Sequence, residues 1–150
     1  MNIPSVHWLR DAATAAGTDP SLQLAAVFDA LGSWYAEPGF RGCAIVNAAT
    51  QHHANPARPA AARHLARHLD LLTDIAARAG ASDPALLGWQ LLILVDGATT
   101  VADHNSAPET AQQAKLAALA LLRASTASTT GSAPTSCSPS MASARAGVMS

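Results

Sequence analysis

The stretch DPALLGWQLLILVDGATTVADHN, residues 83–105, decides the fold class of this chain. It opens with Asp83 and Pro84, a typical helix start, because aspartate accepts a hydrogen bond from the first turn and proline has no N–H to leave unpaired. Between residues 86 and 95 only one glycine and one glutamine interrupt large apolar side chains. A helix that is apolar on every side has to be covered on every side. We therefore predict that one side of this helix packs in the chain's own core and that another protein surface covers its opposite side.

Proline and glycine divide the rest of the chain into further segments whose apolar residues recur at helical spacing. Alanine and leucine dominate these segments, and no run alternates strictly between apolar and polar residues as a half-buried strand does. The pattern predicts an all-α helical bundle of about six helices. The expected helices are 5–16, 20–37, 43–53, 59–79, 84–105 and 109–123.

Composition and charge narrow the class of protein. Of 150 residues, 49% are hydrophobic and 13% charged, with a formal net charge of -1. This is typical of one folded domain, and it lacks the clustered Lys and Arg that bind nucleic-acid phosphates. Cys43 and Cys137 are far apart and do not form a disulfide framework, so a cytoplasmic location is expected. No signal peptide opens the sequence, and the apolar run at 86–95 is shorter than the roughly 20 residues of a membrane span, so we expect no membrane association.

The predicted last helix, 109–123, carries the same surplus of apolar surface as the helix at 84–105. The simplest cover for both is a second copy of the chain, in which the two antiparallel helices of each protomer form a four-helix bundle. We therefore predict a homodimer. The expected dimer-interface residues are Leu86, Leu87, Leu91, Leu94, Val95, Ala98, Val101, Leu116, Leu119 and Leu122.

Two stretches together resemble the effector domain of the tetracycline-repressor (TetR) family of transcriptional regulators. The first, AAVFDALGSWYAEPGFRGCAIVNAATQ, has the aromatic W-x-x-x-P-G-F turn, then R-G-C and a short N-A-A helix. The second, HLDLLTDIAARAGASDPALLGWQLLILVDGATTVA, has the A-x-x-A-G-x-x-D-P pattern that opens the dimerising helix. The resemblance covers residues 6–123, and the order and spacing of its motifs make it specific.

The resemblance implies an effector-binding and dimerisation body whose helices shift when a small hydrophobic molecule enters. Regulators of this family begin with a helix-turn-helix domain, and the position of the matching stretches leads us to expect that this chain lacks that domain. The expected organisation is a remnant of the interdomain helix at 1–17, the effector-binding and dimerisation domain at 18–123, and a disordered Ser/Thr/Ala/Pro-rich tail at 124–150. We expect no direct DNA binding from this chain. The expected partners are a second copy, a small hydrophobic effector and a full-length paralogue in a heterodimer; a protein-interaction module without ligand sensing is the alternative.

Aromatic and polar residues in these segments are candidate ligand contacts, because small-molecule pockets are mostly apolar with a few orienting polar groups. The aromatic residues lie in helices that enclose the pocket in the TetR family, although each also fits an ordinary core position. The embedded amides need a hydrogen-bond partner if they are buried. The expected ligand-binding residues are Phe28, Trp34, Tyr35, Asn47, Gln51, His64, His68, Trp89 and Gln90.

His64 and His68 are four residues apart, a metal-ligand spacing that His52 and His53 could complete. On a helical projection, however, they lie between the polar and apolar faces. This placement favours half-buried or ligand-facing histidines, and we expect no metal and no cofactor.

Two further residues have alternative interpretations. Cys43 is either a reactive thiol near a helix start or a small buried apolar residue, and the second interpretation is favoured. Asp96, the acid in the apolar part of its helix, either pairs across the dimer interface or lies at the edge of the bundle. No nucleophile motif or phosphate-binding loop occurs, so we expect no enzymatic activity.

Overall fold

The computed structural model describes residues 6–51 and 56–130. These residues form helices and connecting turns and contain no strand, which confirms the predicted all-α class. The helices are α1 (Val6–Ala15), α2 (Pro20–Tyr35), α3 (Ala44–Gln51), α4 (Ala57–Arg78), α5 (Pro84–Asn105) and α6 (Thr110–Thr130).

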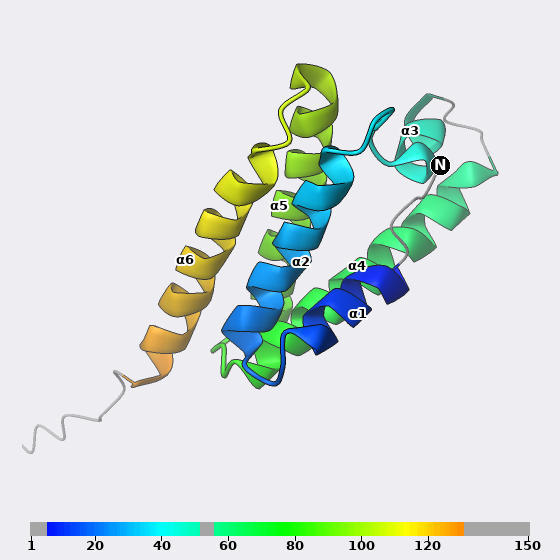
Figure 1. The fold of residues 1–150 in the computed structure, drawn as a ribbon. Coiled ribbons are helices and arrows are strands. Elements are labelled where there is room, and N and C mark those ends of the chain that lie inside the picture. The colour runs from blue at the N-terminus through cyan, green and yellow to red at the C-terminus, as the bar shows by residue number, and fades with distance from the viewer. Residues whose placement is uncertain (1–5, 52–55, 131–150) are drawn as a thin grey trace, which may run out of the picture.

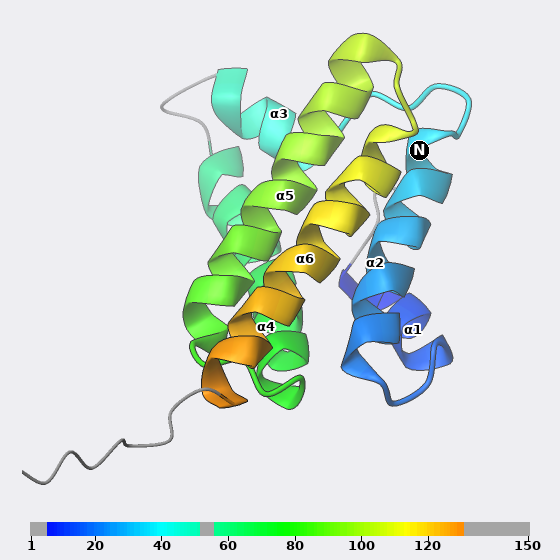
Figure 2. The ribbon, with the colours of Figure 1, turned by 90° about the vertical axis from the view of Figure 1, so that its left-hand side faces the viewer.

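The helices pack in a bundle around α2 and α5. Figure 1 shows α2, α5 and α6 running alongside one another, while α4 and α1 cross them at an angle. α5 contacts α4 on one side and α6 on the other, and α3 packs on the N-terminal part of α4. α5 and α6 are antiparallel and lie side by side on one face of the molecule (Figure 2). These two helices therefore form one face of the molecule, which we call the α5–α6 face.

The helix starts follow the predicted capping chemistry. The Asp19 carboxylate accepts a hydrogen bond from the Ser21 amide at 2.8 Å, and the Asp83 carboxylate accepts one from the Leu86 amide at 3.0 Å. Each aspartate precedes a proline in the first helical turn. α4 ends before Gly80, whose φ of 80° is the left-handed conformation that glycine adopts most readily.

The core is built from apolar side chains of α1, α2, α4, α5 and α6. Phe28 of α2, Ile75 of α4 and Leu91 of α5 are among its fully buried members. α4 and α5 approach closely at Gly88, where a Cβ atom would collide with the Thr73 side chain. Glycine at this position therefore sets the distance between the two helices.

The structure places the expected dimer-interface residues at different depths in the protomer. Five of the ten expected residues lie in the protomer's own core and offer no surface to a second copy: Leu87, Leu91, Val95, Ala98 and Leu122. Leu94 and Leu119 are partly buried against that core. Leu86, Val101 and Leu116 remain exposed, and the outward apolar set of α5 also includes Trp89 and Ile93. An evenly apolar helix gives no sequence signal for which side faces inward.

The last helix is longer than expected. α6 continues to Thr130 instead of ending at residue 123, so the start of the expected disordered tail is helical. The rest of that tail, 131–150, lies outside the described residues, as do His52 and His53.

α5 has 22 residues and, by length and composition alone, could cross a membrane. Core helices pass the same test, and eight residues of α5 are buried against its neighbours.

Candidate functional site

A small, partly open cavity lies where α1, α2, α4 and α5 meet. Its volume is about 20 Å³, enough for roughly one water molecule. Apolar side chains of α1, α2 and α5 form part of the wall. Polar side chains from the turn before α3, from α4 and from α5 complete it. The lining residues are Leu9, Leu31, Trp34, Cys43, His64, His68, Val95, Asp96 and Thr99.

A hydrogen-bond chain joins α2 to the cavity wall. The Thr99 hydroxyl donates to the Val95 carbonyl at 2.8 Å, and the Tyr35 hydroxyl lies 2.7 Å from Thr99 Oγ1. Because Thr99 has a single hydroxyl proton, Tyr35 is the donor in the second bond. Burial raises the pKa of Tyr35 to about 12, against a smaller lowering by the Thr99 hydrogen bond, so the phenol keeps its proton at physiological pH.

His64 and His68 form the most polar part of the wall. Their rings meet edge to face, with centroids 4.3 Å apart. Burial lowers the pKa of His68 to about 4, with a smaller contribution from His64, and burial followed by the Arg67 charge lowers the pKa of His64. Both rings are therefore neutral at pH 7. His68 is only 6% exposed, and its Nε2 atom has no hydrogen-bond partner among the described residues.

Cys43 completes this polar side of the cavity. Its Sγ lies 3.5 Å from His64 Nε2, within hydrogen-bonding range for sulfur. The thiol is partly buried, so it is neither a fully buried apolar residue nor a surface group. In the described part of the chain, no three His, Cys, Asp or Glu side chains are placed to hold a metal ion.

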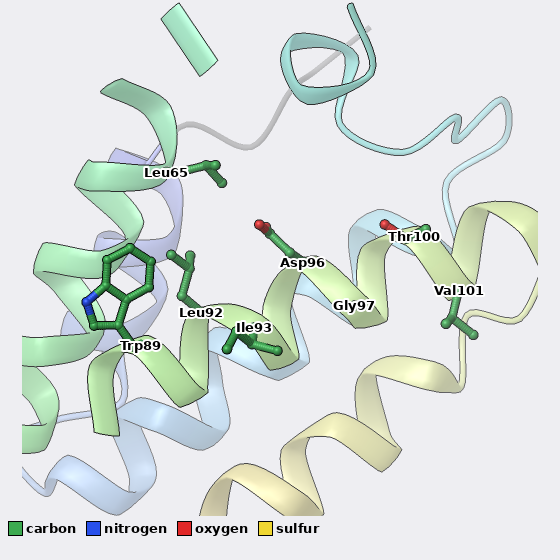
Figure 3. A pocket seen from close by; sticks show the side chains of 8 residues that line it. All are labelled: Leu65, Trp89, Leu92, Ile93, Asp96, Gly97, Thr100 and Val101. Atoms are coloured by element: carbon green, nitrogen blue, oxygen red, sulfur yellow. The ribbon is translucent and has the colours of Figure 1, made fainter. Parts of the chain in front are cut away.

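A wider groove runs along the outside of α5, next to the cavity. It has a volume of about 500 Å³, and Asp96 lines both the groove and the cavity. Figure 3 shows the Asp96 side chain rising from α5 beside Leu65 of α4, with Trp89 near one end of the groove and Val101 at the other. Burial raises the pKa of Asp96. Asp96 is therefore a wall residue that the cavity and the groove share.

The expected ligand-binding residues divide into three groups. Trp34, His64 and His68 line the cavity, and Tyr35 reaches it through its bond to Thr99. Trp89 lies in the outer groove instead and is 56% exposed.

The other four expected ligand-binding residues line neither space. Phe28 is a fully buried core residue. Asn47 is exposed and donates to the Arg41 carbonyl at 3.0 Å, which holds the turn before α3. Gln51 is exposed at the end of α3, and Gln90 is partly exposed on α5. Polarity among apolar neighbours did not distinguish these surface positions from wall positions.

The sequence prediction did not assign several wall residues to the site. Val95 was assigned to the dimer interface, and Leu9, Leu31 and Thr99 were given no role in the site. Thr99 follows Asp96 by three residues, so both side chains project from one side of α5. This pair of polar residues on one side of a largely apolar helix was the available signal.

Comparison with known proteins supports the fold. No protein-family model and no curated protein matches the chain. Among solved structures, a TetR-family transcriptional regulator from Streptomyces coelicolor is similar with a TM-score of 0.70 and 27% identity, covering 81% of this chain and 67% of that one. A proposed TetR transcriptional regulator from Streptomyces avermitilis is similar with a TM-score of 0.65 and 27% identity, covering 80% of this chain and 72% of that one.

These likenesses define the class of structure. The six described helices have a TetR-like all-α fold, as the resemblance of the two sequence stretches implied. Both neighbours are described as transcriptional regulators of the TetR type, and neither is described as an enzyme.

Proposed function

We propose that this chain forms the effector-binding and dimerisation part of a TetR-type transcriptional regulator. The effector is a small hydrophobic molecule, and the regulator acts in the cytoplasm. The proposal adds to the TetR-like fold a ligand site at the cavity and a dimer surface on α5 and α6. It assigns no DNA contact to the described helices, whose charges are not clustered as in a phosphate-binding surface.

The observation that carries the ligand site is the unpaired Nε2 of His68. A buried polar atom without a hydrogen bond costs about 1–3 kcal/mol, and such atoms are rare in folded proteins. Here the atom belongs to a side chain in the cavity wall, close to the Cys43 thiol and the Thr99 hydroxyl. A polar group of a ligand would form the missing hydrogen bond with His68 Nε2, and the apolar part of the ligand would pack against the wall residues of α1 and α2.

The small size of the cavity supports a coupling between ligand binding and helix position. About 20 Å³ cannot hold an organic effector, so α4 and α5 have to move apart before one binds. The adjoining groove of about 500 Å³ falls within the usual range of ligand sites, and moving the Asp96 side chain would join the two spaces. An effector that binds only the opened form shifts the protein towards that form.

Exposed apolar side chains on the α5–α6 face support dimerisation. Ile93 is 66% exposed and Leu116 is 55% exposed, and Leu86 and Val101 are exposed with them. Exposed apolar residues that gather on one face are typical of protein–protein contact sites. Two copies would cover this face by packing α5 and α6 against their symmetry mates. The same face would accept a full-length paralogue of the same architecture.

A ligand screen with a matched pair of variants tests the proposal. Thermal unfolding is measured against a library of small hydrophobic molecules, because a ligand that binds the native state raises the midpoint. His68→Leu removes the unpaired nitrogen from the cavity, and we expect it to abolish the stabilisation. Gln23→Met removes another unpaired buried atom, Gln23 Oε1, far from the cavity wall, and should leave the stabilisation unchanged.

The same screen distinguishes effector binding from the alternative function, a protein-interaction module. A broad library without any stabilising molecule would contradict effector binding and favour the protein-interaction module. Stabilisation that is equal in wild type and in His68→Leu would place the effector elsewhere.

A further inference from the structure

Cys43 and two histidines of α4 place a thiol, a proton acceptor and an unpaired polar atom around the cavity. The Cys43 Sγ lies 3.5 Å from His64 Nε2, and the His64 ring meets the His68 ring edge to face. His68 is 6% exposed, and its Nε2 atom has no hydrogen-bond partner among the described residues. All three side chains line the same cavity. A molecule that enters it would therefore meet a nucleophile and a buried polar group together.

His64 is placed to take the proton of the thiol. The thiolate is the reactive form of cysteine, and an adjacent base produces it as the reaction proceeds. Burial, followed by the charge of Arg67, lowers the pKa of His64, so one ring nitrogen is unprotonated at pH 7. With the ring proton on Nδ1, His64 Nε2 accepts the hydrogen bond from the Cys43 thiol.

Cys43 lies on the loosely packed side of the cavity. It directly precedes α3, an eight-residue helix that has no buried side chain and packs on α4. The thiol itself is only partly buried. A cavity of about 20 Å³ has to open before an organic molecule enters, and a short molecule requires the smallest opening. A bond to Cys43 would then hold that molecule in place.

We propose that Cys43 captures a short α,β-unsaturated carbonyl compound, an enal or enone, as a covalent thioether. The inference rests on the proposed function, because it names the chemical class of the effector.

The reaction is an addition in which atoms and electrons balance. The Cys43 proton passes to His64 Nε2 while the sulfur forms a bond to the β-carbon of the ligand. The π electrons of the C=C bond move onto the α-carbon and the carbonyl oxygen as an enolate, and the proton on His64 then moves to the α-carbon. No leaving group is released, and nothing is oxidised or reduced.

His68 and the composition of the wall favour this class of ligand. With its ring proton on Nε2, His68 donates a hydrogen bond to the carbonyl oxygen, where negative charge develops during the addition. Leu9 and Leu31 provide apolar surface for the alkyl part. Disulfide chemistry would need a second thiol, and no cysteine other than Cys43 lies in the described part of the chain.

Reaction rates of the variant Cys137→Ser test the inference, because Cys43 is then the only thiol in the sequence. Intact-protein mass spectrometry follows the addition of 1-penten-3-one. We expect the native protein to react at least about tenfold faster than the same chain unfolded in guanidinium chloride at the same pH, where the thiol is accessible but has no fixed base. Pentan-3-one, which lacks the C=C bond, should leave the mass unchanged. The variant without either cysteine should stay unmodified over the same time.

Histidine variants in the same background test the two assigned roles. His64→Gln removes the base and should slow the addition at least about tenfold. His68→Leu should slow the addition of the enone about tenfold but leave alkylation by iodomethane unchanged, because iodomethane has no carbonyl oxygen. A general disturbance of the fold would change both rates. His7→Gln, an exposed histidine of α1, is the matched control and should change neither.

The outcomes distinguish this inference from the proposed function. A native thiol that reacts no faster than the unfolded one, or a rate unaffected by His64→Gln, overturns covalent capture. Equal slowing of the enone and iodomethane in His68→Leu overturns the hydrogen bond to the carbonyl and with it the ligand class. Each of these results leaves reversible effector binding in place, because the thermal-unfolding screen decides it separately with molecules that do not react with thiols.

Discussion

The Tyr35 hydroxyl donates a hydrogen bond to Thr99 Oγ1 over 2.7 Å, which joins α2 to α5 at the edge of the cavity. The two residues are 64 positions apart in the sequence, and both are buried. Tyr35 depends on Thr99 for its partner, whereas Thr99 keeps its own bond to the Val95 carbonyl. The pair is therefore asymmetric, and the two single substitutions have different consequences.

We expect Thr99→Val to destabilise the protein more than Tyr35→Phe. The first leaves a buried phenol without an acceptor, at a cost of about 1–3 kcal/mol, while the second removes one bond worth about 1 kcal/mol. Urea unfolding of both variants and of the double variant measures the difference. In the double variant the unpaired phenol is gone, so its destabilisation should be smaller than the sum of the two. Strict additivity, or a larger effect of Tyr35→Phe, would contradict the assigned direction of the bond.

His68 should make the stability of the fold depend on pH. Burial lowers the pKa of its folded state to about 4 from an ordinary value of 6.5. Between these values the unfolded chain binds a proton that the native protein does not, so stability is complete above pH 6.5 and falls as the pH falls towards 4. The loss is on the order of 3 kcal/mol, from the size of the shift.

Chemical denaturation at several pH values checks this expectation. His64 and Asp96 are titratable groups of the same wall, so His68→Leu should remove most of the dependence and leave the part due to these two. The exposed His7 provides the control, because His7→Gln should keep the full dependence. An equal loss of stability on acidification in His68→Leu and wild type would show that another group is responsible.

Gly88 and Gly97, both in α5, should respond to alanine in opposite directions. A Cβ at Gly88 collides with Thr73, so Gly88→Ala forces α4 and α5 apart and should cost about 1–3 kcal/mol. Nothing lies within 4 Å of a Cβ at Gly97, so Gly97→Ala should stabilise the helix by about 0.5–1 kcal/mol. Thermal unfolding of the two variants measures both, and a neutral Gly88→Ala would refute the close approach of the helices.

Local signals predicted the helices well. The Asp–Pro pairs at 19–20 and 83–84 place two helix starts correctly, because cap and proline act within one turn of the chain. The end of α6 was predicted too early, because Ser and Thr after residue 123 favour turns in isolation. In the structure, Leu122 is buried and the Thr126 hydroxyl bonds back to its carbonyl, so the helix continues.

The site was harder to predict, because its residues come together through tertiary packing. Trp34 and Phe28 are both buried residues of α2, yet only Trp34 lines the cavity. In α5, the apolar residues surround the helix, so the sequence could not separate the core residue Leu91 from the exposed Ile93. These assignments require the position of neighbouring helices.

Leu116 on α6 should control the association of two copies. It is 55% exposed on the α5–α6 face, so an aspartate there is tolerated by a single copy but is unfavourable in a dry contact between two. We expect Leu116→Asp to weaken dimerisation by at least about 100-fold, equivalent to roughly 3 kcal/mol, and to change the stability of the protomer by less than about 0.5 kcal/mol. Sedimentation velocity over a range of concentrations measures the association.

Leu22→Asp is the matched control for Leu116→Asp, because Leu22 is 57% exposed on α2 and lies outside the α5–α6 face, so this variant should still dimerise. A wild-type protein that stays monomeric at high concentration, or an equal loss of association in both variants, would rule out the α5–α6 face as the dimer surface.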